Sequence, residues 1–489
     1  MNATSVTASK TVQPTPTSHL QLGVARVEIT PPVGIYHPMW GAARHHRATG
    51  IHRPLYADIL IFAPLVGDGS PWVQVQMDMV GLSARDLHRG MREAVAEGAG
   101  VDTQNVVLSF SHTHAGGLFS PDRVHLPGGE LIMPYLDEVR AKVRAAASEA
   151  AANLSETYLT YGTGRCNMAA NRDFWDDERG IYTCGYNPGA PADDTLYLVR
   201  ATAPDGSLRA TIVNYACHPT TLAWENTQIS PDYVGALRET VEQATSAPCI
   251  FTLGACGDLG PRQGFVGDTA VADANGRQVA YAALSVLTGM DPAGQDFAYR
   301  GPVVSGATLG TWHHLPQSEQ HTETAKLFTG GNNSVDLPQK PRPDAAQLEQ
   351  DLQTYLSQQK EADARGDAVA ARDLGARAER ARRWLNRLSN IPEGPTYPFA
   401  FTVHRLGDAY WVGVGGEPYN ALQTELRATF PDNPIIVTVL AGEPGAAYLL
   451  TADRYGKGLY QEEPSNLAPG CLEKLTEAVI DSIEELQHE

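Results

Sequence analysis

The sequence predicts an α/β fold, one large domain in which mixed, mostly buried β-sheets are flanked by helices. Apolar runs of strand length and β-branched composition recur along the 489 residues, and Gly, Pro or polar clusters end each run. Helical patterns separate several of these runs, which indicates a sheet that is at least partly parallel. Because the runs are continuously apolar rather than alternating, both faces of such a sheet are expected to be buried.

The predicted elements follow one another along the chain in this order. Residues 1–20 are rich in Ser, Thr and Pro and are predicted to form a mobile N-terminal tail. Helical patterns cover residues 135–152 and 269–287, and a further helical stretch covers 472–486. The clearest strand-like runs are residues 57–63, 72–77, 106–110, 211–216, 249–253, 410–414 and 435–440.

Residues 344–389 differ in character from the rest of the chain. They contain 8 acidic and 8 basic residues, together with two apolar stripes at helical spacing on either side of Gly366. This pattern predicts a helical hairpin laid over the core with a mostly solvated, charged face; a lid or an oligomer contact is the alternative. The flanking residues 311–343 and 390–398 are predicted to be Pro- and Gly-rich loops, so the insertion spans about 311–398.

Lysine and arginine contribute 37 residues and aspartate and glutamate 56, so the formal net charge is −19. This balance argues against nucleic acid or an anionic membrane surface as a partner, and favours a small-molecule substrate. No apolar run reaches 18 residues, so stable membrane insertion is not predicted. The lack of a signal peptide's apolar region, together with few cysteines and no CxxC pair, favours a cytoplasmic location. The oligomeric state stays open, with a homo-oligomer as one option.

Polar side chains cluster where the strand-like runs end. His112 and His114 follow the run that ends at residue 110, and His218 follows the run that ends at residue 216. Ligands bind outside the carboxyl ends of strands in open α/β sheets, so these residues are expected to converge. Imidazole, carboxylate and phenol groups together suit Zn²⁺. The other polar or glycine positions at or just beyond such ends are Asp78, Asp258, Gly260, Glu417 and Tyr448.

Each of these residues also has an ordinary structural interpretation. A His-x-His at a strand end is a metal motif about half the time and otherwise a hydrogen-bonded turn. His218, which precedes a proline, is by itself more often a structural histidine than a ligand. Glu417 before Pro418 fits the start of a helix, and Tyr448 alone carries no functional signal. The zinc hypothesis therefore depends on the combination of residues.

The sequence resembles the neutral/alkaline (non-lysosomal) ceramidase family, because these segments follow one another in the same order as in that family. The resemblance covers roughly residues 20–310 and 398–470 and is that of a remote member with the catalytic domain only. It implies one ceramidase-like catalytic domain over residues 21–489, interrupted by the helical-hairpin insertion. The matching blocks are residues 23–32, 50–57, 112–116, 218–219, 257–261, 417 and 448–451.

The resemblance implies a zinc centre built from the residues at the strand ends. A bound Zn²⁺ lowers the pKa of its water from about 15.7 toward 7, so that a zinc-activated water attacks an amide or ester carbonyl. Asp78 and Asp232 are candidate hydrogen-bond partners of the histidine ligands. The implied metal ligands are His112, His218, Glu417 and Tyr448.

Further residues are expected to act on the substrate beside the metal. The resemblance implies that His114 faces the scissile carbonyl as an oxyanion or hydrogen-bond donor. Arg172 falls where the family has a functional arginine near the substrate. Asp258 falls on the aspartate of the family's Gly-Asp-x-Ser-Pro signature, so proton transfer is assigned to Asp258 or His114. Catalytic roles are thus predicted for His114, Arg172 and Asp258, and substrate binding for Arg172, His114 and Gly260.

The sequence departs from the family in three places. Gly260 occupies the position of the signature's catalytic serine, the hairpin region lacks a long apolar stripe, and no segment remains for the family's C-terminal immunoglobulin-like domain. These departures favour a zinc-dependent amidohydrolase that cleaves an amide (or ester) bond in a small polar N-acyl-type substrate. A true lipid amidase, a pseudoenzyme or binding protein, and a zinc lyase on the same scaffold are the alternatives.

Overall fold

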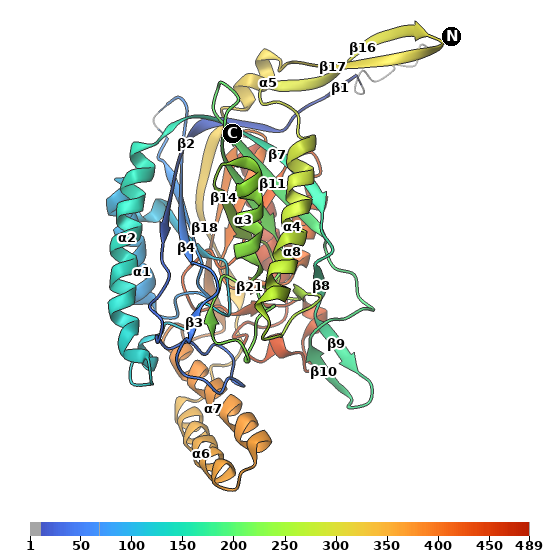
Figure 1. The fold of residues 1–489 in the computed structure, drawn as a ribbon. Helices are drawn as coiled ribbons and strands as arrows, with labels where there is room; N and C mark the ends of the chain where they lie inside the picture. Colours follow the sequence, from blue (N-terminus) through green and yellow to red (C-terminus); the bar gives the residue numbers. More distant parts are fainter. Residues whose placement is uncertain (1–10, 68, 489) are drawn as a thin grey trace.

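The computed structural model describes residues 11–67 and 69–488, and its architecture confirms the α/β prediction (Figure 1). Two mixed sheets form the centre of the molecule, and helices cover their outer faces. The larger sheet has eight strands in the order β14-β12-β11-β7-β2-β4-β5-β6. In chain order these are β2 (Thr17–Glu28), β4 (Tyr56–Ala63), β5 (Trp72–Met77), β6 (Val106–Phe110), β7 (Ser155–Arg165), β11 (Thr195–Thr202), β12 (Leu208–Tyr215) and β14 (Cys249–Leu253).

The larger sheet is parallel at both of its ends and antiparallel in between. Strand β5 pairs in parallel with β6, and β12 pairs in parallel with β14. The sheet is curved enough that residues of β14, at one edge, lie within 8 Å of residues of β5 and β6 at the other edge (Cα–Cα). The loops that leave β6, β12 and β14 are therefore neighbours in space.

The smaller sheet packs against the larger one through a buried aromatic cluster. Phe62 and Trp72 come from the larger sheet and Trp411 from the smaller, with ring centroids 4.8 to 6.0 Å apart. The order of its strands is β18-β19-β20-β22, and β20 pairs in parallel with β22. These strands are β18 (Phe328–Pro338), β19 (Thr396–Leu406), β20 (Ala409–Val414) and β22 (Ile435–Thr438).

Helices bury the remaining faces of the two sheets. On β12, Val213 and Tyr215 pack toward the helical layer while Ile212 packs between the sheets, which explains why the apolar runs do not alternate. The predicted helices over residues 135–152, 269–287 and 472–486 are confirmed. The helices on the larger sheet are α1 (Arg85–Ala99), α2 (Ile132–Ala152), α3 (Tyr233–Thr245) and α4 (Thr269–Gly289), and those on the smaller sheet are α8 (Ala421–Thr429) and α9 (Cys471–His488).

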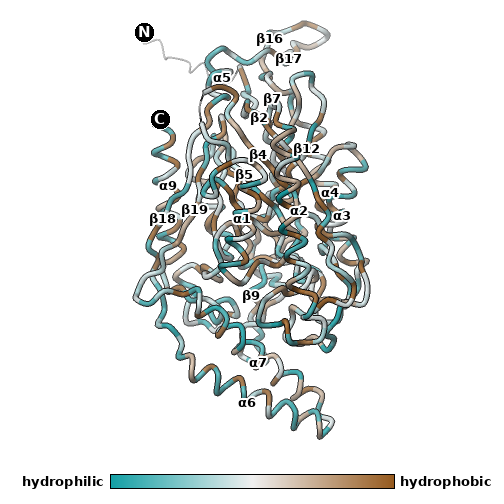
Figure 2. Tube along the Cα trace, turned by 90° about the vertical axis from the view of Figure 1, so that its left-hand side faces the viewer, coloured by the Kyte–Doolittle hydropathy of each residue, from teal (hydrophilic) through white to brown (hydrophobic). Residues whose placement is uncertain are grey.

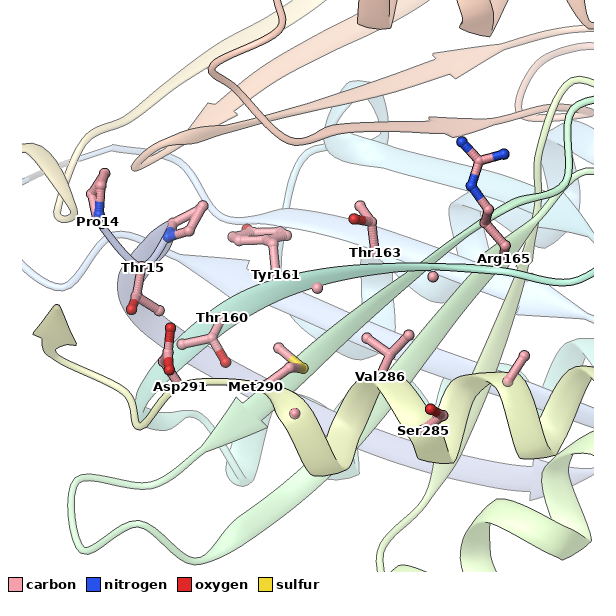
Figure 3. A pocket seen from close by; sticks show the side chains of 15 residues that line it. Pro14, Thr15, Thr160, Tyr161, Thr163, Arg165, Ser285, Val286, Met290 and Asp291 are labelled. Atoms are coloured by element: carbon pink, nitrogen blue, oxygen red, sulfur yellow. The ribbon is translucent and has the colours of Figure 1, made fainter. Parts of the chain in front are cut away.

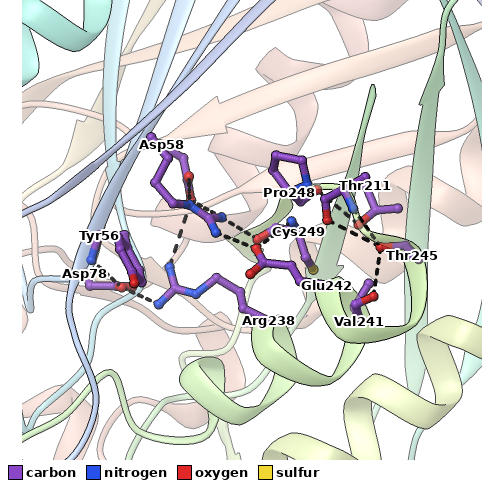
Figure 4. A network of polar contacts seen from close by, with 12 residues as sticks. Tyr56, Asp58, Asp78, Thr211, Arg238, Val241, Glu242, Thr245, Pro248 and Cys249 are labelled. Atoms are coloured by element: carbon purple, nitrogen blue, oxygen red, sulfur yellow. Dashed lines mark hydrogen bonds and ion pairs between the residues drawn. The ribbon is translucent and has the colours of Figure 1, made fainter. Parts of the chain in front are cut away.

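A buried network of ion pairs fastens α3 to the larger sheet (Figure 4). The Arg26 side chain bonds to Asp58 and Glu242, and Arg238 of α3 bonds to Asp78 just after β5. Four of these five side chains are at most 18% exposed, so breaking one pair would leave an uncompensated buried charge. The network holds α3 and the strands in fixed register below the strand ends.

The helical hairpin is confirmed, but it extends from one end of the body rather than lying over the core (Figures 1 and 2). It consists of α6 (Ala345–Ala364) and α7 (Ala368–Leu388). The side chain of Asp344 caps α6, that of Asp367 caps α7, and Gly366 adopts φ +74° between the helices. Leu352, Ala378 and Ala381 form a small core of its own.

The prediction that residues 311–343 form a loop is wrong, because strands cover residues 311–316 and 328–338, whereas residues 390–395 do form the predicted loop before the strand that begins at Thr396. Residues 328–338 form the edge strand β18, paired along its length with β19. Its residues alternate between half-buried and exposed, because one face of an edge strand meets solvent, and Gly and Asn within it masked the pattern. Strands β16 (Gln295–Ser305) and β17 (Ala307–Pro316) form a projecting arm, followed by α5 (Glu319–Thr324).

The predicted mobile tail is wrong for residues 12–20, and residues 1–10 lie outside the described part of the chain. Strand β1 (Val12–Gln13) pairs with β16, and β2 begins at Thr17. Thr15, Thr17 and Ser18 are buried, and the Thr17 backbone N–H donates to Asp408. The Thr17 hydroxyl bonds to the Thr15 carbonyl and the Ser18 hydroxyl to the Tyr161 hydroxyl. The Ser/Thr composition was misleading because these hydroxyls find partners inside the fold.

Short strand pairs connect the loops at the carboxyl ends of the main strands. These pairs are β3 (Gly50–Ile51) with β13 (Gln228–Ile229), β8 (Ala169–Asn171) with β15 (Leu259–Pro261), β9 (Asp173–Asp176) with β10 (Ile181–Cys184), and β21 (Glu417–Pro418) with β23 (Tyr448–Leu449). Among the described residues, no helix is long and apolar enough to cross a lipid bilayer.

Phe62→Ala is expected to lower the free energy of unfolding by about 3–5 kcal/mol, because it opens a cavity between the two sheets. Phe62 is fully buried and stacks on Trp72 with centroids 4.8 Å apart. Chemical denaturation measures the change. The matched control is Val304→Ala on the projecting arm, which is 82% exposed and should shift stability by no more than about 0.5 kcal/mol. Equal effects of the two substitutions would contradict the assigned core.

Candidate metal centre and active site

Three side chains from different strand ends converge at one point. His112 follows β6, His218 follows β12 and Glu417 follows β20, and one ligand atom from each lies within 4.8 Å of the others. Glu417 Oε2 is 2.8 Å from Nε2 of His218 and 3.4 Å from Nε2 of His112. The predicted convergence of these residues thus takes place, and two imidazoles and a carboxylate form a suitable donor set for a divalent metal ion.

Backbone carbonyls fix the orientation of both imidazole rings. His112 donates its Nδ1–H to the carbonyl of Val80 at 2.6 Å, and His218 donates to the carbonyl of Cys256 at 2.6 Å. Because Nδ1 of each ring is engaged by a carbonyl, Nε2 is the nitrogen turned toward Glu417. His112 itself adopts φ +65°, a conformation that side-chain-bearing residues rarely take. The ligand geometry is therefore built by the loop backbone.

The carboxylates proposed as partners of the two histidines act elsewhere, so that prediction is wrong. Asp78 accepts a hydrogen bond from Arg238 in the network of Figure 4. Asp232 accepts the backbone N–H groups of Leu222 and Tyr233 and caps α3. The imidazoles instead bond to backbone carbonyl oxygens of the loops that follow the strands. Sequence spacing does not reveal such backbone partners.

The electrostatic environment favours the protonation states that metal binding needs. Burial, with a contribution from Arg172, lowers the pKa of His218 to about 4. Burial alone would raise the pKa of Glu417, but the neighbouring His112 and His218 lower it well below its usual value. A neutral imidazole and an ionised carboxylate at neutral pH are the forms that bind a cation.

Tyr448 lies beside this centre. It is the parallel-bridge partner of Glu417, and its ring is 6.3 Å from that of His218 between centroids. Its hydroxyl accepts a hydrogen bond from Arg172 Nη2 at 3.1 Å. Burial raises the pKa of Tyr448 well above its usual value. Arg172 is held in place by the Gly257 carbonyl, to which Nη2 donates at 2.7 Å.

His114 lies on the open side of the centre. Its ring is 4.8 Å from that of His112 and 5.0 Å from that of Trp40 between centroids. Its Nε2 is buried without a hydrogen-bond partner. Burial, together with the charges of His112 and His218, lowers its pKa well below the usual value, so the ring is neutral at pH 7. An unpartnered imidazole nitrogen facing a cavity is available to a ligand.

Two adjoining cavities, of about 460 Å³ and 220 Å³, meet at the centre. Both are lined by His112 and Glu417, and the larger one also by His114, Arg172 and Tyr448. Such volumes are typical of small-molecule sites. Sequence reasoning missed Trp40, Thr220, Tyr460 and the α7 residues Arg383 and Arg387, which also line the larger cavity.

A third hollow lies away from the centre, between β7 and α4 (Figure 3). Its volume is about 530 Å³, and it exists partly because Gly162 and Gly164 carry no side chains beneath the helix. Its charged residues, Arg165 and Asp291, stand at opposite ends in Figure 3. With no converging polar groups, this groove is not a candidate active site.

Comparison with known proteins identifies the family of this chain. The model of the neutral/alkaline non-lysosomal ceramidase family, N-terminal part, matches residues 20–271. The chain belongs to this family. Its fold is similar to that of neutral ceramidase from Pseudomonas aeruginosa, with a TM-score of 0.64 and 16% identity, over 97% of this chain and 75% of that one. A second solved structure, a ceramidase complexed with C2, gives a TM-score of 0.64 and 15% identity over 97% and 76%.

Membership of the ceramidase family supports hydrolysis of an amide bond as the activity. The match covers the segments that carry His112, His114, Arg172, His218 and Asp258. Glu417 and Tyr448 lie beyond it, and the fold brings them to the same centre.

The family signature around Asp258 and Gly260 lies behind the cavities rather than in their walls. The Asp258 carboxylate accepts the backbone N–H of Asn420 at 2.7 Å and lines neither cavity. A Cβ added to Gly260 would lie 3.6 Å from Arg172 Cδ and 3.7 Å from Thr220 Oγ1, which are ordinary contact distances. A side chain that begins with a Cβ, such as that of serine, would therefore fit at residue 260. The buried Thr220 hydroxyl beside it has no hydrogen-bond partner.

Asp258→Asn is expected to remove a pH dependence of stability. Burial raises the pKa of Asp258 to about 6, above its unfolded value of about 3.8, so its stabilising contribution is present at low pH and is lost as the pH rises from about 4 through 6. Relative to wild type, the variant should gain about 3 kcal/mol in free energy of unfolding between pH 4 and pH 7.

Denaturant titrations at several pH values measure this difference, and the exposed Asp432→Asn is the control that should leave the profile unchanged. A stability difference that does not vary with pH would contradict the assigned environment of Asp258.

Proposed function

We propose that this protein is a zinc-dependent amidohydrolase that cleaves a non-peptide C–N bond in an N-acyl substrate. The observation that carries the proposal is the convergence of His112, His218 and Glu417, with both Nδ1 atoms committed to backbone carbonyls. Tyr448, paired with Glu417 across the β21–β23 bridge, is proposed as the fourth ligand. Residues 21–489 are proposed as one catalytic domain with the α6–α7 hairpin inserted.

The donor set suits zinc better than a hard cation. Two neutral imidazoles, one carboxylate and one phenol are the nitrogen and oxygen donors that Zn²⁺ takes in tetrahedral sites, whereas Mg²⁺ and Ca²⁺ prefer oxygen donors only. When bound, the ion supplies Lewis acidity toward the substrate carbonyl and a water of lowered pKa.

The surrounding residues are proposed to bind and orient the amide. Arg172, fixed by the Gly257 carbonyl, and His114, with its free Nε2, flank the centre from the larger cavity and are assigned to stabilise the developing oxyanion. The overall reaction adds water across the amide: oxygen bonds to the carbonyl carbon, the C–N bond breaks and the amine nitrogen takes the proton. His114 is the group placed to carry that proton, because Asp258 lines neither cavity.

A lipid amide of the ceramide type is the second candidate substrate, and family membership favours it. The aromatic residues Trp40, Trp224 and Phe265 of the larger cavity would accommodate an acyl chain. The arginines of α7 argue against a lipid substrate, because they make the wall that the two cavities share polar. A panel of amides graded from polar N-acyl compounds to a short-chain ceramide separates the two substrates by their relative kcat/KM.

His112→Ala and His218→Ala are each expected to abolish amide hydrolysis and reduce bound zinc from one equivalent to a small fraction, because each removes a ligand whose ring is already oriented. Elemental analysis of the purified proteins and hydrolysis assays measure the two effects. The matched control is His125→Ala, an exposed histidine that should keep both zinc and activity.

Stoichiometric zinc in both variants would overturn the ligand assignment. A wild-type protein that binds zinc but hydrolyses no member of the panel would favour the binding-protein alternative. If wild type is active, removal of zinc with a chelator should abolish the activity and re-addition of zinc should restore it.

A further inference from the structure

The walls of the two cavities are basic, although the chain as a whole carries a net charge of −19. The described residues that line the two cavities include five arginines and four glutamates, but no lysine and no aspartate. One of the glutamates, Glu417, is committed to the metal centre. The arginines are Arg123, Arg172, Arg380, Arg383 and Arg387, and the glutamates are Glu379, Glu417, Glu443 and Glu463.

Two carboxylates of this wall already neutralise the neighbouring α7 and Arg123 side chains. Glu379 is shared by Arg123 and Arg383, each at 2.8 Å. Glu463 pairs with Arg380 at 3.4 Å. Arg123 has a second acidic partner in Asp122, at 3.5 Å. Five arginines against four glutamates, with Glu417 committed to the metal centre, still leave the wall with an excess of positive charge, which is costly in a partly buried place unless an anion is bound there.

Of the α7 arginines that line the cavities, Arg387 is the one that lacks an acidic partner among the described residues. Within the described residues, no carboxylate lies within 4.0 Å of its guanidinium nitrogens, and one of them donates to the Pro464 carbonyl at 2.7 Å. Its guanidinium stacks over the Trp384 ring at 5.0 Å. Burial, with a contribution from Arg383, lowers the pKa of Arg387.

The position of Arg387 relates it to the reaction centre. It lines both cavities, as do Arg383, His112 and Glu417, so it stands where the two compartments meet at the metal centre. Its guanidinium lies over the Trp384 ring and one nitrogen donates to Pro464, which leaves further N–H donors without an acidic partner. A planar guanidinium so held binds a carboxylate through two parallel hydrogen bonds.

We propose that the substrate of this amidohydrolase carries an anionic group, of carboxylate type, that binds Arg387 close to the scissile amide. The substrate class is thus an N-acyl compound with a carboxylate, such as an N-acyl amino acid, whose apolar part packs on Trp40, Trp224 and Phe265. This inference rests on the proposed amide hydrolysis, and it assigns the α7 helix a role in substrate selection.

The test compares matched anionic and neutral amides with the zinc-loaded full-length protein. N-hexanoylglycine and N-hexanoylglycinamide differ by a charge on the amine side; N-hexylsuccinamic acid and N-hexylsuccinamide differ by a charge on the acyl side. Wild type is expected to favour the anionic member of at least one pair by tenfold or more in kcat/KM. Arg387→Met should reduce kcat/KM for that anionic member by about 10- to 100-fold and leave its neutral partner within twofold.

The control variant is Arg377→Met, an exposed arginine on the same helix that lines neither cavity. It should leave all four substrates unchanged. Equal kcat/KM for both members of each pair, equal losses for both members in Arg387→Met, or a preference for a neutral short-chain ceramide over all four compounds would overturn the inference while leaving amide hydrolysis intact.

A binding measurement tests the proposed anion site independently of the proposed amide hydrolysis. If wild type hydrolyses no amide, the proposed function fails, and calorimetry of the two anionic compounds and their neutral partners still tests the anion site. Tighter binding of an anionic member to wild type than to Arg387→Met, with no difference for its neutral partner, supports the site. Identical binding to the two proteins overturns it.

Discussion

The curvature of the eight-stranded sheet is the constraint on which the rest of the structure depends. Strands β6 and β14 are its opposite edges, yet residues of β14 lie within 8 Å of residues of β5 and β6. The loops after β6, β12 and β14 share one space, because the His114 backbone N–H donates to the Pro219 carbonyl and the His218 backbone N–H donates to the Leu259 carbonyl. The smaller sheet adds the loop after β20. His112, His218 and Glu417 meet there although 305 positions separate the first from the last.

The centre is made by backbone as much as by side chains. Carbonyl oxygens of Val80 and Cys256 determine which nitrogen of each imidazole is free, and the Gly257 carbonyl holds Arg172. These are groups that every residue offers, so no residue type in the sequence marks them. The buried ion pairs around Arg26 and Asp58 then keep α3 against the strands, so that the loops extend from a rigid base (Figure 4).

Strands with a continuously apolar sequence were predictable, whereas the middle strands β2, β7 and β11 of the larger sheet and the edge strand β18 were not. The runs 72–77, 106–110 and 249–253 coincide with β5, β6 and β14, because burial on both sides demands continuous apolar residues. Edge strand β18 contains Gly, Asn and Pro, and its pairing with β19 decides its conformation. The same holds for residues 12–20, whose hydroxyls are satisfied only inside the fold.

By itself, the sequence determined the α/β class, five strands of the larger sheet (β4, β5, β6, β12 and β14) and the polar side chains that follow the strands, because the residue types at a strand and at its end are local features. It also placed this chain beside the ceramidases through the order of short segments. The tertiary structure alone decided that Asp258 stands behind the cavities and that α7 supplies their arginine wall. Those facts depend on which loop lies against which, and contacts between distant segments are set by packing of the whole chain rather than by any local pattern.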